Sequence, residues 1–334
     1  MKSTNKNAGA AIGLDVGTSR VVLAQKNGDE FSYASELNAF VTLPYSKLTA
    51  SMLEKERVPH TVEDGGIVVY GNESARFAEL MNGEIRRPMT KGTLDAKEPE
   101  ALKQIRQLIT GMTGAPRDGQ TVCFTVPAPP VGAQESVTYH ESTLRQMLGE
   151  LGYATRSVNE AMAVIYSELE SSNYTGIGVS LGGGLCNVAM SYLAMPVFSF
   201  SVPKAGDYVD SSAAAMTGER ANSIRLLKEE SFHFNGFWAD KLHQVIGVYY
   251  DEMIQAVIGG LKDVIASTRS LPKIGRAAPL VLSGGSAMPK GFRDRFEKAL
   301  AAAELPVAIS EVRLAENPLT AAARGALIAA LVEM

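Results

Sequence analysis

Residues 12–17 read Ile-Gly-Leu-Asp-Val-Gly, and residues 177–182 repeat this pattern as Ile-Gly-Val-Ser-Leu-Gly. Residues 11–25 are apolar and β-branched on both sides of the turn Gly17-Thr18-Ser19, a pattern that predicts a β-hairpin. The second copy also precedes an apolar stretch, so the unit occurs twice, far apart in one chain. The repeat predicts a duplicated fold of two lobes whose two turns face one ligand from opposite sides.

The bulk composition fits this prediction. The chain has 334 residues, too many for one ordinary core, and is 46% hydrophobic and 20% charged, as expected of a folded globular protein. A net charge of −4 gives no basic field, so we expect no nucleic-acid partner. Two cysteines, Cys123 and Cys186, are too few for a disulfide framework and wrongly spaced for a zinc site.

The ends and apolar runs favour a cytoplasmic protein. Residues 1–10 are polar and lack the apolar run of a signal peptide, and no stretch of about 18 apolar residues follows. We therefore expect no transmembrane segment, whereas contact with a membrane surface through a loop stays open.

The remaining periodicities predict an alternating α/β chain. Residues 28–87 are mixed and predict a small inserted subdomain, and residues 102–112 predict a helix that leads into a strand at 121–126. A second helix over 144–151 ends at Gly152. Residues 211–230 and 240–270 predict two long helices, and a strand at 279–282 precedes the turn 283–286. Helices over 291–303 and 318–331 complete the chain.

The glycine-rich turns have the chemistry of phosphate loops. Glycine allows backbone N–H groups to point at a ligand and lets the ligand approach closely. Asp15 adds a carboxylate and Thr18 and Ser19 add hydroxyls, a set that can hold phosphates and a hydrated Mg²⁺. The triple glycine 182–184 can cradle phosphate from the other side, and the turn 283–286 suits sugar and adenine. One such turn is weak evidence, but three in this order are stronger.

The order of these motifs, together with residues 159–163 (Asn-Glu-Ala-Met-Ala) and 317–325 (Asn-Pro-Leu-Thr-Ala-Ala-Ala-Arg-Gly), resembles the signature of the actin superfamily. Residues 205–210 and 218–220 most resemble the MreB-type bacterial actins. The resemblance implies an α/β fold of two duplicated ribonuclease H-like (actin-like) domains with a nucleotide cleft between them. The expected first lobe is 1–155 plus 319–334, with an insertion at about 28–87. The expected second lobe is 156–318, with a helical insertion at about 207–272.

The same resemblance assigns roles to individual residues, with ATP or ADP and Mg²⁺ as the bound cofactors. Glu160 would act as general base by orienting the attacking water, and Asp15 would hold Mg²⁺ through water. The first phosphate loop would comprise Asp15, Gly17, Thr18 and Ser19, and the second Gly182, Gly183 and Gly184. Gly206 and Asp207 would approach the phosphates and ribose, and Glu219, Arg225, Gly284, Gly285 and Ser286 the adenosine. An ordinary solvated helix pair is the alternative for Glu219 and Arg225.

The second loop departs from the family pattern. Bacterial actins have Asp-(Ile/Leu)-Gly-Gly-Gly-Thr-Thr-Asp, whereas residues 180–187 read Ser-Leu-Gly-Gly-Gly-Leu-Cys-Asn. Ser180 and Asn187 replace acids, and Leu185 and Cys186 replace hydroxyls. Phosphate cradling would persist while metal and water positioning would suffer, so we expect nucleotide binding with weak or absent ATPase activity.

Three functions fit the sequence to different degrees. The leading prediction is a filament-forming cytoskeletal subunit, with self-association as the main partnership. The alternative is a non-polymerising actin-like adaptor that recruits protein partners. A remote alternative is a serine hydrolase, because Gly178-x-Ser180-x-Gly182 matches a nucleophile elbow, with His140, His233 or His243 as base. That elbow needs a helix directly after the serine, whereas residues 185–192 predict a strand.

Overall fold

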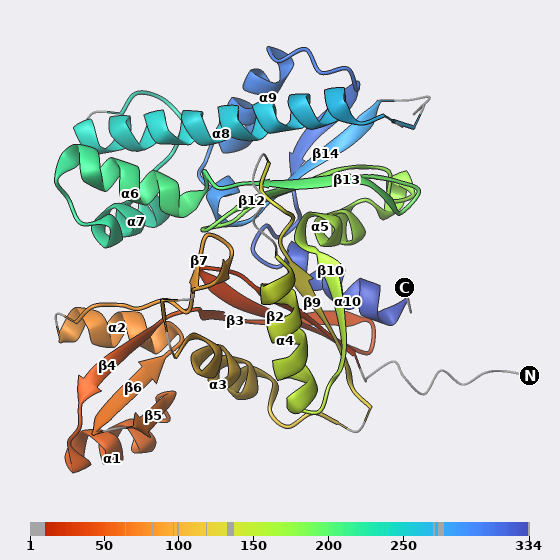
Figure 1. Ribbon diagram of the computed structural model, residues 1–334. Helices are drawn as coiled ribbons and strands as arrows, with labels where there is room; N and C mark the ends of the chain where they lie inside the picture. Colours follow the sequence, from red (N-terminus) through yellow and green to blue (C-terminus); the bar gives the residue numbers. More distant parts are fainter. Residues whose placement is uncertain are drawn as a thin grey trace, which may run out of the picture.

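The computed structural model describes residues 11–63, 65–81, 83–95, 97–98, 100–117, 119–131, 137–238, 240–269, 271–272 and 277–332. Within these residues the chain forms two lobes, one above the other in Figure 1, and each lobe is built on a five-stranded sheet.

The lower sheet contains the first hairpin. Its strand order is β10-β9-β1-β2-β3, with β1 antiparallel to β2 and parallel to β9. The strands are β1 (Ala11–Val16), β2 (Arg20–Asn27), β3 (Glu30–Leu37), β9 (Thr121–Val126) and β10 (Ala154–Asn159). Helices α3 (Ala101–Thr113) and α4 (Thr138–Glu150) bury their apolar faces with β1, β2 and β9 in one core cluster.

The upper sheet repeats this arrangement. Its order is β13-β12-β11-β14-β15, with β11 antiparallel to β12 and parallel to β14. The strands are β11 (Gly176–Leu181), β12 (Cys186–Tyr192), β13 (Met195–Val202), β14 (Ala278–Ser283) and β15 (Ile309–Leu314). Read from the opposite edge, the order matches the lower sheet strand for strand, and the predicted duplication is confirmed.

The second residue of each repeated motif explains how the two sheets share helices. Helix α5 (Glu160–Glu168) follows β10 of the lower sheet but packs on β11, while α10 (Ala321–Leu331) follows β15 but packs on β1. A Cβ added to Gly13 would overlap with Ala323 O of α10, and one added to Gly178 would overlap with Ala161 O of α5. These two glycines therefore allow each helix to lie directly on the other half's sheet.

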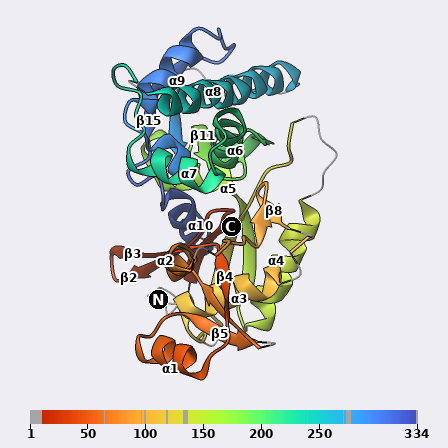
Figure 2. The ribbon, with the colours of Figure 1, turned by 90° about the vertical axis from the view of Figure 1, so that its left-hand side faces the viewer.

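Further elements extend each lobe beyond its five-stranded sheet. A three-stranded sheet, β4 (Phe40–Pro44), β6 (Gly66–Tyr70) and β5 (His60–Glu63), carries α1 (Lys47–Lys55) and α2 (Asn72–Leu80) at the lower end of the molecule (Figure 2). A short hairpin, β7 (Met89–Thr90) and β8 (Thr93–Leu94), follows them. The upper lobe carries α8 (Lys241–Ser267) and α9 (Phe292–Ala301). Single 3₁₀ turns occur at Glu170–Ser172 and Gly285–Ala287.

One predicted helix was wrong. Residues 211–230 form parts of two helices, α6 (Gly206–Thr217) and α7 (Ala221–Glu230), instead of one. Gly218 separates them with a φ of 79°, the left-handed conformation that ends a helix. No helix of the described residues is long and apolar enough to cross a membrane.

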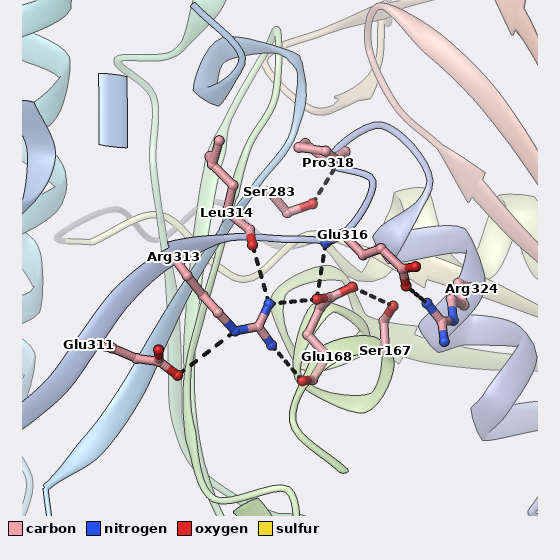
Figure 3. A network of polar contacts seen from close by, with 9 residues as sticks. All are labelled: Ser167, Glu168, Ser283, Glu311, Arg313, Leu314, Glu316, Pro318 and Arg324. Carbon is pink, nitrogen blue, oxygen red and sulfur yellow. Dashed lines mark hydrogen bonds and ion pairs between the residues drawn. The ribbon is translucent and has the colours of Figure 1, made fainter. Parts of the chain in front are cut away.

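The two chain segments that connect the lobes are tied to each other (Figure 3). Glu168, the last residue of α5, accepts hydrogen bonds from Arg313 Nη1 at 2.8 Å and from the backbone N–H of Glu316 at 3.2 Å. Arg324 of α10 in turn pairs with the Glu316 carboxylate at 2.8 Å. The network joins the end of α5 to the connection between β15 and α10, where the chain passes from one lobe to the other.

Candidate functional site

A cavity of about 510 Å³ lies between the two lobes, where the two repeated hairpins meet. The structure describes every predicted site residue, and all of them except Glu219 line this cavity. They are Asp15, Gly17, Thr18, Ser19, Glu160, Gly182, Gly183, Gly184, Gly206, Asp207, Arg225, Gly284, Gly285 and Ser286. Glu219 is exposed just beyond the end of α6 and does not line the cavity, so its nucleotide contact stays a prediction.

The two glycine loops have the same turn geometry and touch each other. Gly17 N–H donates to Arg20 O at 2.9 Å, and Gly182 N–H donates to Leu185 O at 3.0 Å. A Cβ added to Gly183 would overlap with Ser19 Oγ, and one added to Gly184 would overlap with Thr18 Oγ1. The hydroxyls of the first loop therefore contact the glycines of the second. The sequence repeat predicted two turns that face one ligand, and both loops line the same cavity.

Glu160 is held by the two residues that replace the family acids. It is the first residue of α5, whose N-cap Asn159 accepts hydrogen bonds from the backbone N–H groups of Ala161 and Met162. Ser180 Oγ donates to Glu160 Oε1 at 2.7 Å, and Asn187 Nδ2 donates to Oε2 at 2.8 Å. Asn187 Oδ1 accepts from the backbone N–H of Ala128 at 2.9 Å. The substituted side chains thus supply donors to the candidate base.

Two half-buried carboxyl groups face the cavity, and each has a raised pKa. Burial raises the pKa of Asp15 to about 6, against the lowering effect of the hydroxyl of Thr125, which donates to Asp15 Oδ1 at 2.5 Å. Burial and the nearby Asp15 charge raise the pKa of Glu160 to about 8. Hard divalent cations prefer carboxylate oxygens as ligands, and a bound cation would offset the cost of ionising these two carboxyl groups.

These pKa shifts predict the pH dependence of stability. A carboxyl group whose folded-state pKa is raised contributes stability below its unfolded-state pKa, near 4, and loses it as the pH rises through the folded value. We expect the free energy of unfolding without added ligand to fall between pH 5 and about 8. The free energy of unfolding of Glu160→Gln, measured by urea denaturation at each pH, should fall less steeply with pH than that of wild type. An equal fall in the two proteins would contradict the raised pKa of Glu160.

The third turn and α6 complete the wall beside the second loop. Gly206 N–H donates to Gly182 O at 3.0 Å, Asp207 N–H donates to Gly183 O at 2.8 Å, and Ser286 Oγ donates to Gly182 O at 3.0 Å. Gly284 has a φ of 89°, and its N–H donates to Pro318 O at 2.8 Å. The turn 283–286 therefore lies against the phosphate-like loop instead of forming a separate site.

Several residues around the cavity were not predicted from the sequence. Lys228 and Asp210 form a buried ion pair at 2.8 Å in the cavity wall, and burial raises the pKa of Asp210. Arg87, from the lower lobe, pairs with Asp207 at 2.8 Å. Charged residues of this kind look like solvated surface in a sequence. Only the fold brings Lys228 and Asp210 into the cavity wall and Arg87 to Asp207.

Among the described residues, the surroundings of Ser180 do not fit the serine-hydrolase alternative. Ser180 lies in β11, opposite Asn187 of β12, and its hydroxyl donates to Glu160. β12 follows the glycine turn where an elbow would need a helix. Within the described part of the chain, His140 contacts Leu94 N, and His243 contacts Asp240 and Ser231.

Solved structures with the same fold are numerous. A structure of the MamK double helical filament matches with a TM-score of 0.71 and 18% identity, covering 97% of this chain and 98% of that one. MreB5 of Spiroplasma citri bound to AMPPNP matches at 0.68 with 14% identity, covering 97% and 96%. The ethanolamine utilization protein EutJ from Carboxydothermus hydrogenoformans matches at 0.56 with 16% identity, covering 95% and 88%. No curated protein sequence matches.

The duplicated sheets, together with these matches, show that the chain has the actin-like fold of the MamK and MreB5 structures. The predicted fold class is confirmed. The sequence profile of the Volactin family matches residues 10–330, so the chain belongs to that family.

Proposed function

We propose that the protein binds ATP and ADP with Mg²⁺ in the cavity between its lobes, and that it assembles into filaments with slow ATP hydrolysis. The observation that carries the proposal is the contact of two glycine loops, one from each half of a duplicated chain, at one cavity of about 510 Å³. Proteins of the same fold have been solved as the MamK filament and as MreB5 bound to ADP or AMPPNP, which supports the proposed assembly and the proposed nucleotide binding.

The proposed roles follow the loops. Backbone N–H groups of residues 17–19 and 182–184 would surround the phosphates, with Thr18 and Ser19 adding hydroxyls. Mg²⁺ would be held by Asp15 through water, where it would offset phosphate charge. Gly206 and Asp207 would face the phosphates and ribose, and Arg225 and the turn 284–286 the adenosine. We keep the lobe limits of 1–155 plus 319–334 and 156–318 as part of this proposal, together with a cytoplasmic location.

Slow hydrolysis follows from the second loop. Leu185 and Cys186 are buried where family members have hydroxyls, and Cys186 Sγ donates to Lys204 O at 3.3 Å, so neither side chain can hold a catalytic water. Glu160 retains a place beside the loop as the candidate general base. Phosphoryl transfer depends on positioning and charge compensation, which these side chains supply poorly.

Calorimetry with ATP and ADP, with and without Mg²⁺, tests the binding. Uptake of neither nucleotide in the presence of Mg²⁺ would refute the proposal. Sedimentation of the same protein tests assembly, since nucleotide-dependent pelleting supports filaments, whereas a monomer under every condition favours the adaptor. A steady-state turnover equal to that of an ordinary bacterial actin would overturn the slow hydrolysis.

A further inference from the structure

The segment 87–94, which we call the flap, contacts both glycine loops at its tip. The β7–β8 hairpin turns at Lys91 and Gly92, both with positive φ. Gly92 N–H donates to Thr18 Oγ1 of the first loop at 3.0 Å. A Cβ on Gly92 would overlap with the Leu185 side chain, and one on Gly184 would overlap with Gly92 N. The flap therefore starts in the lower lobe and ends against the upper lobe's loop.

At the base of the flap, Arg87 reaches the upper lobe. Arg87 Nη1 donates to Asp207 Oδ1 at 2.8 Å, with 22% and 37% of the two side chains exposed. Asp207 lies in the first turn of α6, beside Gly183, and lines the cavity. Arg87 is not one of the described residues that line the cavity. A carboxylate on the cavity wall is thus neutralised by a cation from the opposite lobe.

This arrangement has an electrostatic consequence for an anionic ligand. An uncompensated carboxylate beside a polyphosphate repels it, and the repulsion grows with the number of phosphate charges. The neighbouring acid, Asp210, already has its own partner in Lys228 at 2.8 Å. Asp207 also interacts electrostatically with Arg225 of its own lobe, but its hydrogen-bonded ion pair is with Arg87. That pair can exist only while the two lobes are close together.

We propose that Arg87 is a positioning residue that couples lobe closure to polyphosphate binding, because it neutralises Asp207 only in the closed molecule. The inference rests on the proposed nucleotide site and adds a determinant of selectivity for phosphate charge. Arg87 acts through Asp207 and does not itself contact the ligand.

The residue before Arg87 offers a matched control. Arg86 and Phe40 exchange two backbone hydrogen bonds of 2.9 Å, and the Arg86 guanidinium lies 4.8 Å from the centre of the Phe40 ring. Arg86 also pairs with Glu98 at 2.6 Å. These contacts attach the flap to β4 of the inserted sheet. Removing the Arg86 side chain therefore deletes the same charge one residue before the flap, without removing a partner of Asp207.

The test is a double-mutant cycle read with ligands of different charge. Dissociation constants of ATP, ADP and adenosine are measured by calorimetry for wild type, Arg87→Ala, Asp207→Asn, the double variant and Arg86→Ala. We expect Arg87→Ala to weaken ATP binding about tenfold, ADP binding less, and adenosine binding by no more than about twofold. In the Asp207→Asn background the loss of Arg87 should change ATP binding by no more than about twofold. Arg86→Ala should leave the ratio of ATP to adenosine affinity unchanged.

Two results would overturn the inference while leaving the nucleotide site intact. One is an Arg87→Ala variant that weakens all three ligands equally, and the other is the same ATP penalty with and without the Asp207 carboxylate. Failure of wild type to bind any nucleotide refutes the proposed function first and the inference with it. If Arg87→Ala melts well below wild type, Arg87→Gln must show the same dependence on ligand charge, and its absence there counts against the inference.

Discussion

Replacing Gly184 with alanine is expected to abolish tight nucleotide binding. A Cβ at this position would overlap with Thr18 Oγ1 and with Gly92 N, and would lie 3.1 Å from the carbonyl carbon of Lys91. Two of these neighbours are backbone atoms and cannot move aside as a flexible side chain can. The methyl group would therefore push the second loop away from the first loop and the flap. We expect the dissociation constant for ATP to rise at least about a hundredfold, since loops that each bind one side of a ligand lose most affinity when separated.

Gly111→Ala is the control, because Gly111 is exposed in α3 and is not one of the residues that line the cavity. A Cβ there has no neighbour within 4 Å, so the substitution adds the same methyl group without a steric clash. Its ATP affinity should stay close to that of wild type in the same calorimetric assay. Equal losses in the two variants would show that contact between the loops is unimportant for binding.

The repeated motif allowed the central architecture to be predicted because hairpins and phosphate-like turns are local in sequence. The turns at Gly17 and Gly182 close with equivalent backbone hydrogen bonds, which a short stretch of glycine and apolar residues specifies by itself. Gly13 and Gly178 belong to the same motif, yet the need for glycine at these two positions does not come from the hairpin itself. Each glycine contacts a helix from the other half of the chain, and the sequence of either hairpin does not predict that helix.

The environment of Glu160 shows the limit of sequence reasoning. Ser180 and Asn187 look like losses when compared with the family pattern, because the acids they replace are expected near the metal. In the folded chain both side chains donate to the two oxygens of Glu160, and Asn187 also connects to the backbone of Ala128. Aligned motifs report which residues changed, whereas the new partners depend on how β11, β12 and α5 pack.

The helix break at Gly218 and the contact of Arg87 with Asp207 were missed for different reasons. Gly218 is a helix-ending signal in the sequence, but the helical periodicity on both sides of it favoured one continuous helix. Arg87 and Asp207 are 120 residues apart, and Arg87 alone resembles a surface charge. A long-range ion pair between two lobes follows from their relative placement, which periodicity does not encode.

Replacing Gly325 with alanine is expected to cause a large loss of stability. Gly325 lies where α10 crosses α5, and a Cβ there would overlap with the carbonyl oxygen and carbon of Ala163 and lie 2.8 Å from its Cα. Helix backbones at such close approach have no side chain that can rotate away. We expect the free energy of unfolding to fall by about 3 kcal/mol, at the upper end of the cost of an overpacked core position. Urea denaturation measures this loss.

Gly259→Ala separates this steric cost from the general effect of alanine in a helix. Gly259 is exposed in the middle of α8, and a Cβ added there has no neighbour within 4 Å. Alanine at this site should stabilise the protein by about 0.5 to 1 kcal/mol, because it reduces the conformational entropy lost on folding. We therefore expect the free energy of unfolding to fall in Gly325→Ala and to rise in Gly259→Ala. A Gly325→Ala variant as stable as wild type would contradict the steric explanation. Because α5 begins with Glu160, a displaced α10 should also weaken nucleotide binding through the shift of that helix.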